Sequence, residues 1–321
     1  MAYEKFIQNI ESTKLLKEIE QFLIFGKHCN RDYEGEVKGR GDQVTIKGLG
    51  EPTIYTINKD GTYAANAVGP GSVAGTGKDV IHKGIPDAEE IAGSEVKIQV
   101  NRMELFNYMV GKIDSELTKE YGLINKYRTK TAKRMANKKD QYIASSIVGF
   151  ADAENTATET YTAGTGTYLT AGDDIAADAD AGTPAYHNIL DFIDEQVEIF
   201  NGRDYGDNET FFGEVTPKFW RCLKKALRKE NTDNSRLIEG REITTYNGID
   251  FVKTNNAVVN GNEYCIIRNG EAVTFINAIA EIQPYKPEKG FGDALKGFSL
   301  YDVGIIQPKG MLWSKILGYS I

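Results

Sequence analysis

The chain has few of the residues from which metal and redox centres are built. Its 321 residues include only three cysteines and three histidines. The cysteines form no Cys-x-x-Cys pair, so we interpret them as free thiols in a reducing cytoplasm rather than a disulfide framework or a zinc site. The histidines lie in separate segments, without the spacing of a metal site or a catalytic pair. These residues are Cys29, Cys222, Cys265, His28, His82 and His187. We expect no cofactor, no metal and no catalytic residue.

The chain also lacks a long apolar run and an excess of positive charge. No stretch approaches the roughly 20 apolar residues of a membrane span, and residues 1–14 lack the basic start and apolar centre of a signal peptide. A formal net charge of −8 argues against a dedicated nucleic-acid-binding protein, although it permits local basic faces. We therefore expect a globular protein that is made inside a cell, contacts no membrane and contacts DNA only non-specifically.

Two segments resemble ligand-binding loops in composition only. Residues 69–79, GPGSVAGTGKD, have Ser72 where a phosphate loop needs Gly and Asp79 where it needs Ser or Thr, so a flexible loop tip is the better interpretation. Residues 172–180, GDDIAADAD, cluster carboxylates that a hard cation could use, but they lack the central Gly and terminal Glu of an EF-hand loop. We interpret the surrounding residues 151–184, with seven acids and no Lys or Arg, as a solvated surface insertion.

Residues 103–150 are the stretch around which we expect the chain to be organised. Between residues 114 and 148 the stretch contains no proline and one glycine, which predicts one long helix of roughly 50 Å. Apolar residues recur at three- and four-residue spacings and form a thin stripe, so the helix must lean on other elements. The opposite side is basic, because residues 112–140 hold nine Lys or Arg against four acids.

Shorter elements precede this helix. Apolar residues at helical spacing up to Gly26 predict an amphipathic N-terminal arm that docks either on its own domain or on a neighbouring subunit. Residues 30–110 predict short strands with Gly-rich connections and a hairpin turn at 58–61. The strand signals are at 44–46, 53–57 and 96–100. Because a two-stranded excursion buries too little apolar surface to be stable alone, we expect it to contact another molecule.

The C-terminal half alternates helix and strand, which indicates an α+β core. The predicted elements are a helix at 187–200, a strand at 209–215, a helix from 217, strands at 241–246 and 249–254, and two strands within 298–316 that break at 308–310. Thr216 and Pro217 are an N-cap and a first-turn proline. Asn247 and Gly248 are the strongest hairpin signal in the sequence.

Four segments, taken in order around the long helix, carry a family resemblance. They are residues 30–50 (NRDYEGEVKGRGDQVTIKGLG), 138–147 (KKDQYIASSI), 246–258 (YNGIDFVKTNNAV) and 284–308 (PYKPEKGFGDALKGFSLYDVGIIQP). Together they resemble the major capsid protein of tailed bacteriophages, which has the Hong Kong 97 fold. Asp140, Tyr142 and Ile143 fall on the D-x-Y-I pattern that ends the family's spine helix. Asp302 stands where many members have Gly.

The resemblance implies an α+β, Hong Kong 97-like fold in five parts. These are an N-terminal arm (1–41), an extended β-hairpin loop (42–105), a peripheral domain with the spine helix and the acidic insertion (106–185), an axial domain (186–276) and the return strands of the peripheral domain (277–321). The implied function is self-assembly through pentamers and hexamers into an icosahedral head around double-stranded DNA. A separate scaffolding protein, a portal protein and decoration proteins are the implied partners, with assembly in the bacterial host cytoplasm and a final place in the virion.

Two sets of residues are candidates for contacts in such a shell. The inter-subunit candidates, from the arm and the extended loop, are Phe6, Ile10, Leu16, Phe22, Tyr55, Ile57 and Tyr63. The candidates that face DNA, from the basic side of the helix, are Lys126, Lys130, Lys133, Arg134 and Lys138. Two alternatives stay open: an encapsulin-like nanocompartment that stores a cargo enzyme, and a soluble enzyme that uses the acidic or Gly-rich loops.

Overall fold

A computed structural model describes most of the chain, which divides into two compact units. Unit 1 comprises Met1–Val44 and Ile98–Ile321, and unit 2 comprises Thr45–Lys97. The described residues are 17–33, 40–49, 55–57, 63–65, 93–111, 123–150, 166–176, 178, 182–203, 210–229, 245–288 and 292–320.

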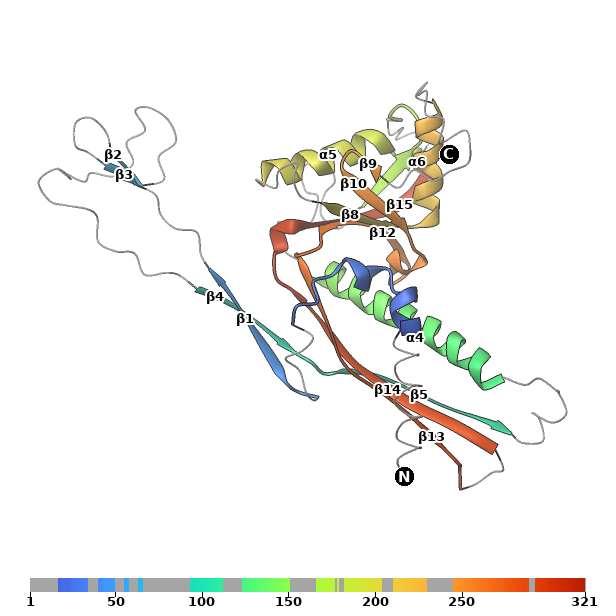
Figure 1. The fold of residues 1–321 in the computed structure, drawn as a ribbon. Helices are drawn as coiled ribbons and strands as arrows, with labels where there is room; N and C mark the ends of the chain where they lie inside the picture. Colours follow the sequence, from blue (N-terminus) through green and yellow to red (C-terminus); the bar gives the residue numbers. More distant parts are fainter. Residues whose placement is uncertain are drawn as a thin grey trace, which may run out of the picture. The chain divides into compact units, whose positions relative to one another are not determined.

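An eight-stranded mixed sheet forms one part of unit 1 (Figure 1). Its strand order is β7-β6-β15-β12-β8-β10-β9, and β11 pairs with β12 beside this path. The strands are β6 (Thr167–Thr170), β7 (Tyr186–Asn188), β8 (Phe211–Val215), β9 (Thr245–Tyr246), β10 (Ile249–Lys253), β11 (Val258–Val259), β12 (Asn262–Asn269) and β15 (Met311–Ser320). Asn247 and Gly248 have φ of 44° and 79° between the antiparallel β9 and β10, so the predicted hairpin is confirmed.

Two helices, α5 (Ile189–Gly202) and α6 (Pro217–Lys229), cover one face of this sheet. The side chain of Asn188 caps α5 by accepting a hydrogen bond from the Leu190 N–H at 3.0 Å. Thr216 caps α6 by accepting from the Phe219 N–H at 3.3 Å, which confirms the predicted start of that helix. The apolar stripes of both helices pack with the sheet into one buried core.

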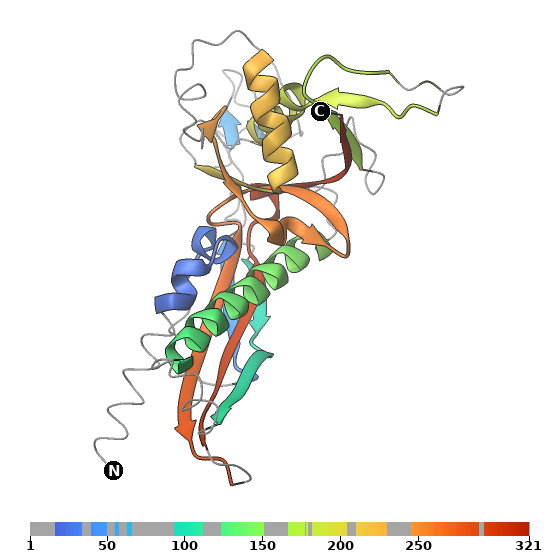
Figure 2. The same cartoon turned by 90° about the vertical axis from the view of Figure 1, so that its right-hand side faces the viewer.

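A second, three-stranded sheet lies beside the long helix α4 (Leu123–Gly149), as Figure 2 shows. Its strands, in the order β13-β14-β5, are β13 (Val273–Tyr285), β14 (Gly292–Ile305) and β5 (Arg102–Gly111). Ala136, Ile143 and Ile147 of α4 are buried in a core shared with these strands, with the other face of the eight-stranded sheet and with the N-terminal segment.

The organising stretch differs from the expectation at its start. Residues 102–111 form strand β5, and the helix is described from Leu123, with 112–122 outside the described residues. Glu104, Phe106 and Tyr108 are half-buried and alternate with exposed neighbours, which is the two-residue period of a strand. The 27 residues of α4 correspond to about 40 Å, and residues 114–122 of the predicted helix lie outside the described residues.

The interpretation of residues 151–184 as a surface insertion is wrong for one segment. Strand β6 lies between β7 and β15 inside the eight-stranded sheet, and Leu169 is fully buried. Thr, Tyr and Leu in TYLT suit a strand, and the acidic residues on both sides of them concealed this local signal. Strand β15 belongs to the same sheet, beside β12, rather than pairing with the return strands β13 and β14.

Unit 2 is built from paired strands. β2 (Tyr55–Ile57) pairs antiparallel with β3 (Tyr63–Ala65), so the predicted hairpin is confirmed, although its turn residues lie outside the described ranges. β1 (Gln43–Leu49) pairs with β4 (Gly93–Gln99), and each of these two strands has one end in unit 1. Short 3-10 turns elsewhere in the chain are η1 (Phe25–His28), η3 (Asn255–Ala257) and η4 (Pro308–Gly310).

Candidate functional site

A buried ion pair holds the N-terminal segment onto unit 1. Arg268 on β12 and Glu214 on β8 are fully buried, with Arg268 Nη2 2.8 Å from Glu214 Oε1. The same guanidinium donates to the backbone carbonyls of Phe25 and His28, each at 2.9 Å. Because a buried guanidinium needs its donors satisfied, the pairing fixes residues 25–28 to the sheet.

Asp140 on α4 holds the same segment from the other side. Its carboxylate accepts hydrogen bonds from the Ile24 N–H at 2.9 Å and the Gly26 N–H at 3.3 Å. Burial raises the pKa of Asp140 to about 6, despite the opposing effect of these two donors. Ile19, Leu23 and Phe25 are fully buried in the core around α4. Of the two expected docking places for the arm, the described part, from residue 17, therefore uses its own domain.

Asp302 links the start of β5 to α4 and β14. One of its carboxylate oxygens accepts from the Tyr142 hydroxyl at 2.9 Å and the other from the Asn101 N–H at 3.1 Å. The Arg102 guanidinium lies 4.5 Å from the centre of the Tyr142 ring. Asp302 thus holds the segment through which the chain returns from unit 2, a contact that a Gly at this position could not make.

The predicted basic face of α4 is open to solvent. Its five candidates, Lys126, Lys130, Lys133, Arg134 and Lys138, are all exposed. Lys139, counted in the same basic set by sequence, is instead fully buried and donates to Asn277 Oδ1 at 2.9 Å and Ser299 Oγ at 2.8 Å. The basic face is therefore narrower than the residue count indicates.

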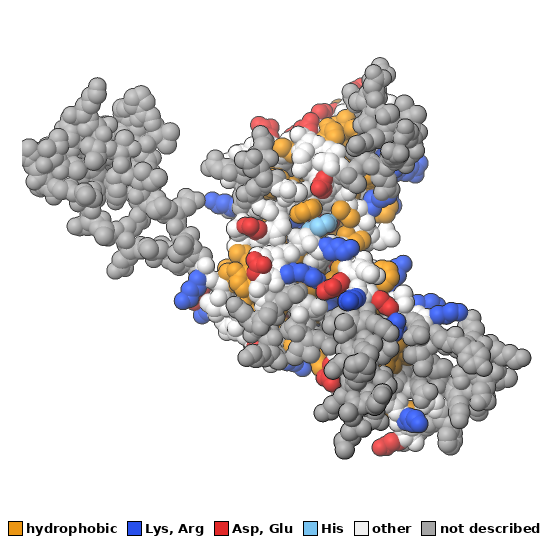
Figure 3. Space-filling model, in the orientation of Figure 1, with side chains coloured by type: hydrophobic (Ala, Val, Ile, Leu, Met, Phe, Trp, Pro, Cys, Tyr) orange, Lys and Arg blue, Asp and Glu red, His pale blue; other side chains and the backbone are white. Residues whose placement is uncertain are grey.

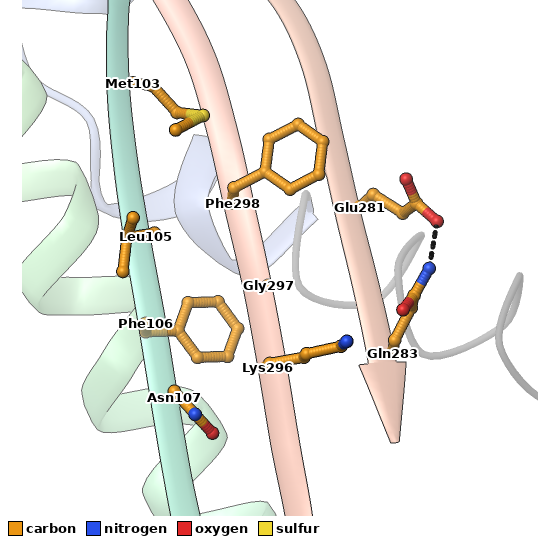
Figure 4. A pocket seen from close by; sticks show the side chains of 9 residues that line it. All are labelled: Met103, Leu105, Phe106, Asn107, Glu281, Gln283, Lys296, Gly297 and Phe298. Atoms are coloured by element: carbon orange, nitrogen blue, oxygen red, sulfur yellow. Dashed lines mark hydrogen bonds between the residues drawn. The ribbon is translucent and has the colours of Figure 1, made fainter. Parts of the chain in front are cut away.

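The three-stranded sheet exposes an apolar surface on the face opposite α4. Met103, Leu105 and Met109 expose 41, 69 and 50% of their surface, whereas Tyr108, which alternates with them, has its ring centre 5.9 Å from that of Tyr127 on α4. Figure 4 shows the hollow of about 350 Å³ on this face. Its lining is Met103, Leu105, Phe106, Asn107, Glu281, Gln283, Lys296, Gly297 and Phe298. Apolar side chains with a polar rim are typical of a protein contact.

The inter-subunit candidates are only partly within the described residues. Phe6, Ile10 and Leu16 lie outside them. Phe22 is half-buried and packs against the core around α4. Tyr55, Ile57 and Tyr63 lie in β2 and β3, and in the backbone register of this hairpin Ile57 pairs with Tyr63 and Tyr55 pairs with Ala65. Phe22 belongs to unit 1, and the three residues of β2 and β3 belong to unit 2.

The three cysteines are buried thiols. Burial raises the pKa of each, that of Cys222 to about 11, so they stay protonated and unreactive near neutral pH. Within the described ranges no three His, Cys, Asp or Glu side chains gather as a metal site would require. No helix there is long and apolar enough to span a membrane.

Sequence reasoning missed the buried charges and the strong basicity of α6. Glu214 interrupts the otherwise apolar strand FFGEV, and Arg268 directly follows the apolar run YCII, which is the signal that could have predicted a buried pair. Helix α6 was predicted from its N-cap, its first-turn proline and its apolar face, and its charge was not considered.

No protein-family model and no curated protein matches the chain. Solved structures do match it, over most of its length. A structure of Mycobacterium phage Che8 aligns with a TM-score of 0.63 and 18% identity, covering 92% of this chain and 91% of that one. The capsid of cyanophage P-SCSP1u aligns at 0.54 and 16%, covering 88% and 84%. The mature capsid of bacteriophage PhiM1 aligns at 0.53 and 16%, covering 86% and 82%.

The chain has the Hong Kong 97-like capsid fold. The fold class and the resemblance predicted from sequence are therefore confirmed. At 16 to 18% identity the capsid fold is shared through the order and pairing of elements rather than through most side chains. The motif on α4 has structural roles in this capsid fold: Asp140 holds the N-terminal segment, Tyr142 binds Asp302, and Ile143 is buried in the core.

Proposed function

We propose that this chain is the major capsid protein of a tailed bacteriophage. The observation that carries the proposal is the capsid fold shared over 92% of this chain and 91% of the matching Che8 chain. The protein acts as a structural subunit and not as an enzyme, and its work is to form pentamers and hexamers that close into an icosahedral head.

We assign shell roles to the five parts of the chain within this proposal. The arm (1–41) and the extended loop (42–105) contact neighbouring subunits, and the axial domain (186–276) lies at the centre of each pentamer or hexamer. Residues 106–185 and 277–321 supply the peripheral domain. The apolar face around Leu105 supports a subunit contact there, because 69% of this side chain is exposed. Many weak contacts of this kind add up through multivalency.

The partners follow from the same role. A separate scaffolding protein guides assembly, a portal protein occupies one vertex, and decoration proteins bind the outer surface. The head assembles in the bacterial host cytoplasm and encloses double-stranded DNA. Lys126, Lys130, Lys133, Arg134 and Lys138 face this DNA, which requires positive charge but no base-specific contacts. An assembled structure with these side chains on the outer surface would contradict that assignment.

Particle size is the decisive test. The expressed protein, alone or with its scaffolding protein, should sediment as a multi-megadalton particle and form closed shells in electron micrographs. Deleting residues 49–94 should leave a folded, soluble subunit that cannot close shells. A wild-type chain that remains a monomer at all concentrations would contradict the capsid role, and normal shells from the deletion would contradict the role of the extended loop.

A further inference from the structure

Helices α5 and α6, which cover one face of the eight-stranded sheet, carry opposite charges. Helix α5 has four acidic residues and no Lys or Arg. Helix α6 has six basic residues and no Asp or Glu. In a chain with a net charge of −8, such a concentration of positive charge on 13 residues is a local feature.

The charged residues of the two helices share one spacing. On α5 they are Asp191, Asp194, Glu195 and Glu198, and on α6 the central four are Arg221, Lys224, Lys225 and Arg228. Both sets occupy positions i, i+3, i+4 and i+7, which is one face of a helix about 10 Å long. Because this pattern reads the same from either end, the two faces match whether the helices meet parallel or antiparallel.

Both charged faces point away from the core of unit 1. Asp191, Glu198, Arg221 and Arg228 are exposed, while the apolar stripes of their helices are buried. Figure 3 shows acidic side chains along the edge where α5 lies in Figure 1, and basic side chains at the edge where α6 lies. The two faces therefore occupy different sides of the same unit.

Within the part of the chain that the structure describes, the charges on these faces are mostly unpaired. Among the described residues, no ion pair involves the α5 residues Asp191, Glu195 and Glu198. The same holds for Arg221 and Arg228 of α6. Only Asp194 on α5 has a side-chain partner, since its Oδ1 accepts from Asn247 Nδ2 at 2.9 Å. Like charges at i+3 and i+4 repel one another, so each face is unfavourable until a partner of opposite charge covers it.

We propose that the basic face of α6 in one copy of the chain docks on the acidic face of α5 in the next copy. The inference rests on the proposed function, and it names a contact between axial domains. Since the two faces differ and lie on different sides of the unit, the contact is head-to-tail, and repetition generates a closed ring such as a pentamer or a hexamer. Nucleic acid could also bind α6, but an acidic partner of identical spacing on the same chain favours a second copy.

Charge reversal tests the docking with matched triple variants. The base-reversed variant carries Arg221→Glu, Lys225→Glu and Arg228→Glu, and the acid-reversed variant carries Asp191→Lys, Glu195→Lys and Glu198→Lys. Each should fold, as judged by circular dichroism, because the substituted side chains are exposed or half-exposed. Each alone should need a protein concentration raised at least about tenfold for assembly, measured by sedimentation velocity.

Two combinations should restore assembly. A single chain with all six substitutions reverses the net sign of both faces and keeps the wild-type net charge of the chain, so it should assemble at a lower concentration than either triple variant alone. An equimolar mixture of the two triple variants should assemble into rings with an even number of subunits, because the two variants must alternate. Moderate salt should weaken wild-type association and the restored associations alike.

The outcomes separate this contact from the capsid role. Wild-type assembly by both triple variants would overturn the docking and leave the capsid role intact. So would a base-reversed variant that assembles normally but loses binding to double-stranded DNA. A charge-dependent dimer that grows no further would overturn the ring. Charge-dependent rings that never close into shells would support the docking and contradict the capsid role, and a wild-type monomer at all concentrations would contradict both.

Discussion

Removing the Arg268 guanidinium should destabilise the subunit more than any change to a surface ion pair. In Arg268→Met the side chain keeps its apolar length but loses the hydrogen bonds to Glu214, to the Phe25 carbonyl and to the His28 carbonyl. Glu214 stays fully buried, and among the described residues only His28, with Nδ1 at 3.1 Å, remains as a side-chain partner. The substitution therefore leaves a buried carboxylate without its counter-ion.

The magnitude follows from these contacts. Breaking a buried ion pair by removing one partner costs about 3–5 kcal/mol, and two carbonyls without donors add about 1–3 kcal/mol together when overlap is allowed for. We expect a loss of about 5 kcal/mol, which is comparable to the whole free energy of unfolding of many domains. Adding Glu214→Gln to Arg268→Met removes the buried charge, so the double variant should recover about 2 kcal/mol relative to Arg268→Met alone.

Urea unfolding of the unassembled subunit, followed by circular dichroism, measures these differences in the free energy of unfolding. Hydrogen exchange of residues 24–30 reports whether the N-terminal segment detaches from the sheet. Lys218→Met is the matched control. Its ion pair with Glu263 is shorter, at 2.6 Å, but the Lys218 side chain is 71% exposed, so the loss should stay below about 1 kcal/mol. A loss below about 1 kcal/mol for Arg268→Met, or a double variant less stable than Arg268→Met, would refute the reasoning.

Two further predictions concern the buried and half-buried carboxylates. The pKa of Asp140 is raised from 3.8 to about 6. Its contribution to the free energy of unfolding is therefore most favourable below about pH 4 and is lost as pH rises through 6. The free energy of unfolding of Asp140→Asn relative to the wild type should thus increase by about 2.5 kcal/mol from pH 4 to pH 7 in urea unfolding, and an opposite trend would show that the N–H donors outweigh burial. Asp302→Gly should accelerate hydrogen exchange of the Asn101 amide about fivefold or more, whereas Lys296→Gly, an exposed position on the same strand, should leave it unchanged. Equal exchange in the two variants would contradict the role of Asp302.

The sequence predicted correctly the elements that depend on interactions between residues a few positions apart. The N-cap at Thr216, the hairpin at Asn247 and Gly248 and the apolar stripe of α6 each depend on residues a few positions apart, and all three form as expected. Strand β6 was missed because its place between β7 and β15 is set by partners far away in sequence. Residues 103–111 were assigned to the helical stretch because the alternation that marks β5 becomes decisive only when β14 pairs along its whole length.

Charge at candidate sites was harder to predict than secondary structure, because the same residue type serves opposite purposes. Lys138 and Lys139 are neighbours in the sequence, but Lys138 is exposed and Lys139 is fully buried between Asn277 and Ser299. The helical period places them about 100° apart, so a count of basic residues cannot separate a DNA-facing lysine from one that holds a sheet. Position relative to the apolar stripe can separate them, since Lys139 lies midway between Met135 and Ile143 on the buried side of α4. The same criterion applies to α6, where Arg221, Lys225 and Arg228 lie outside the buried stripe. We therefore expect these three residues, and not basic residues in general, to contact another subunit.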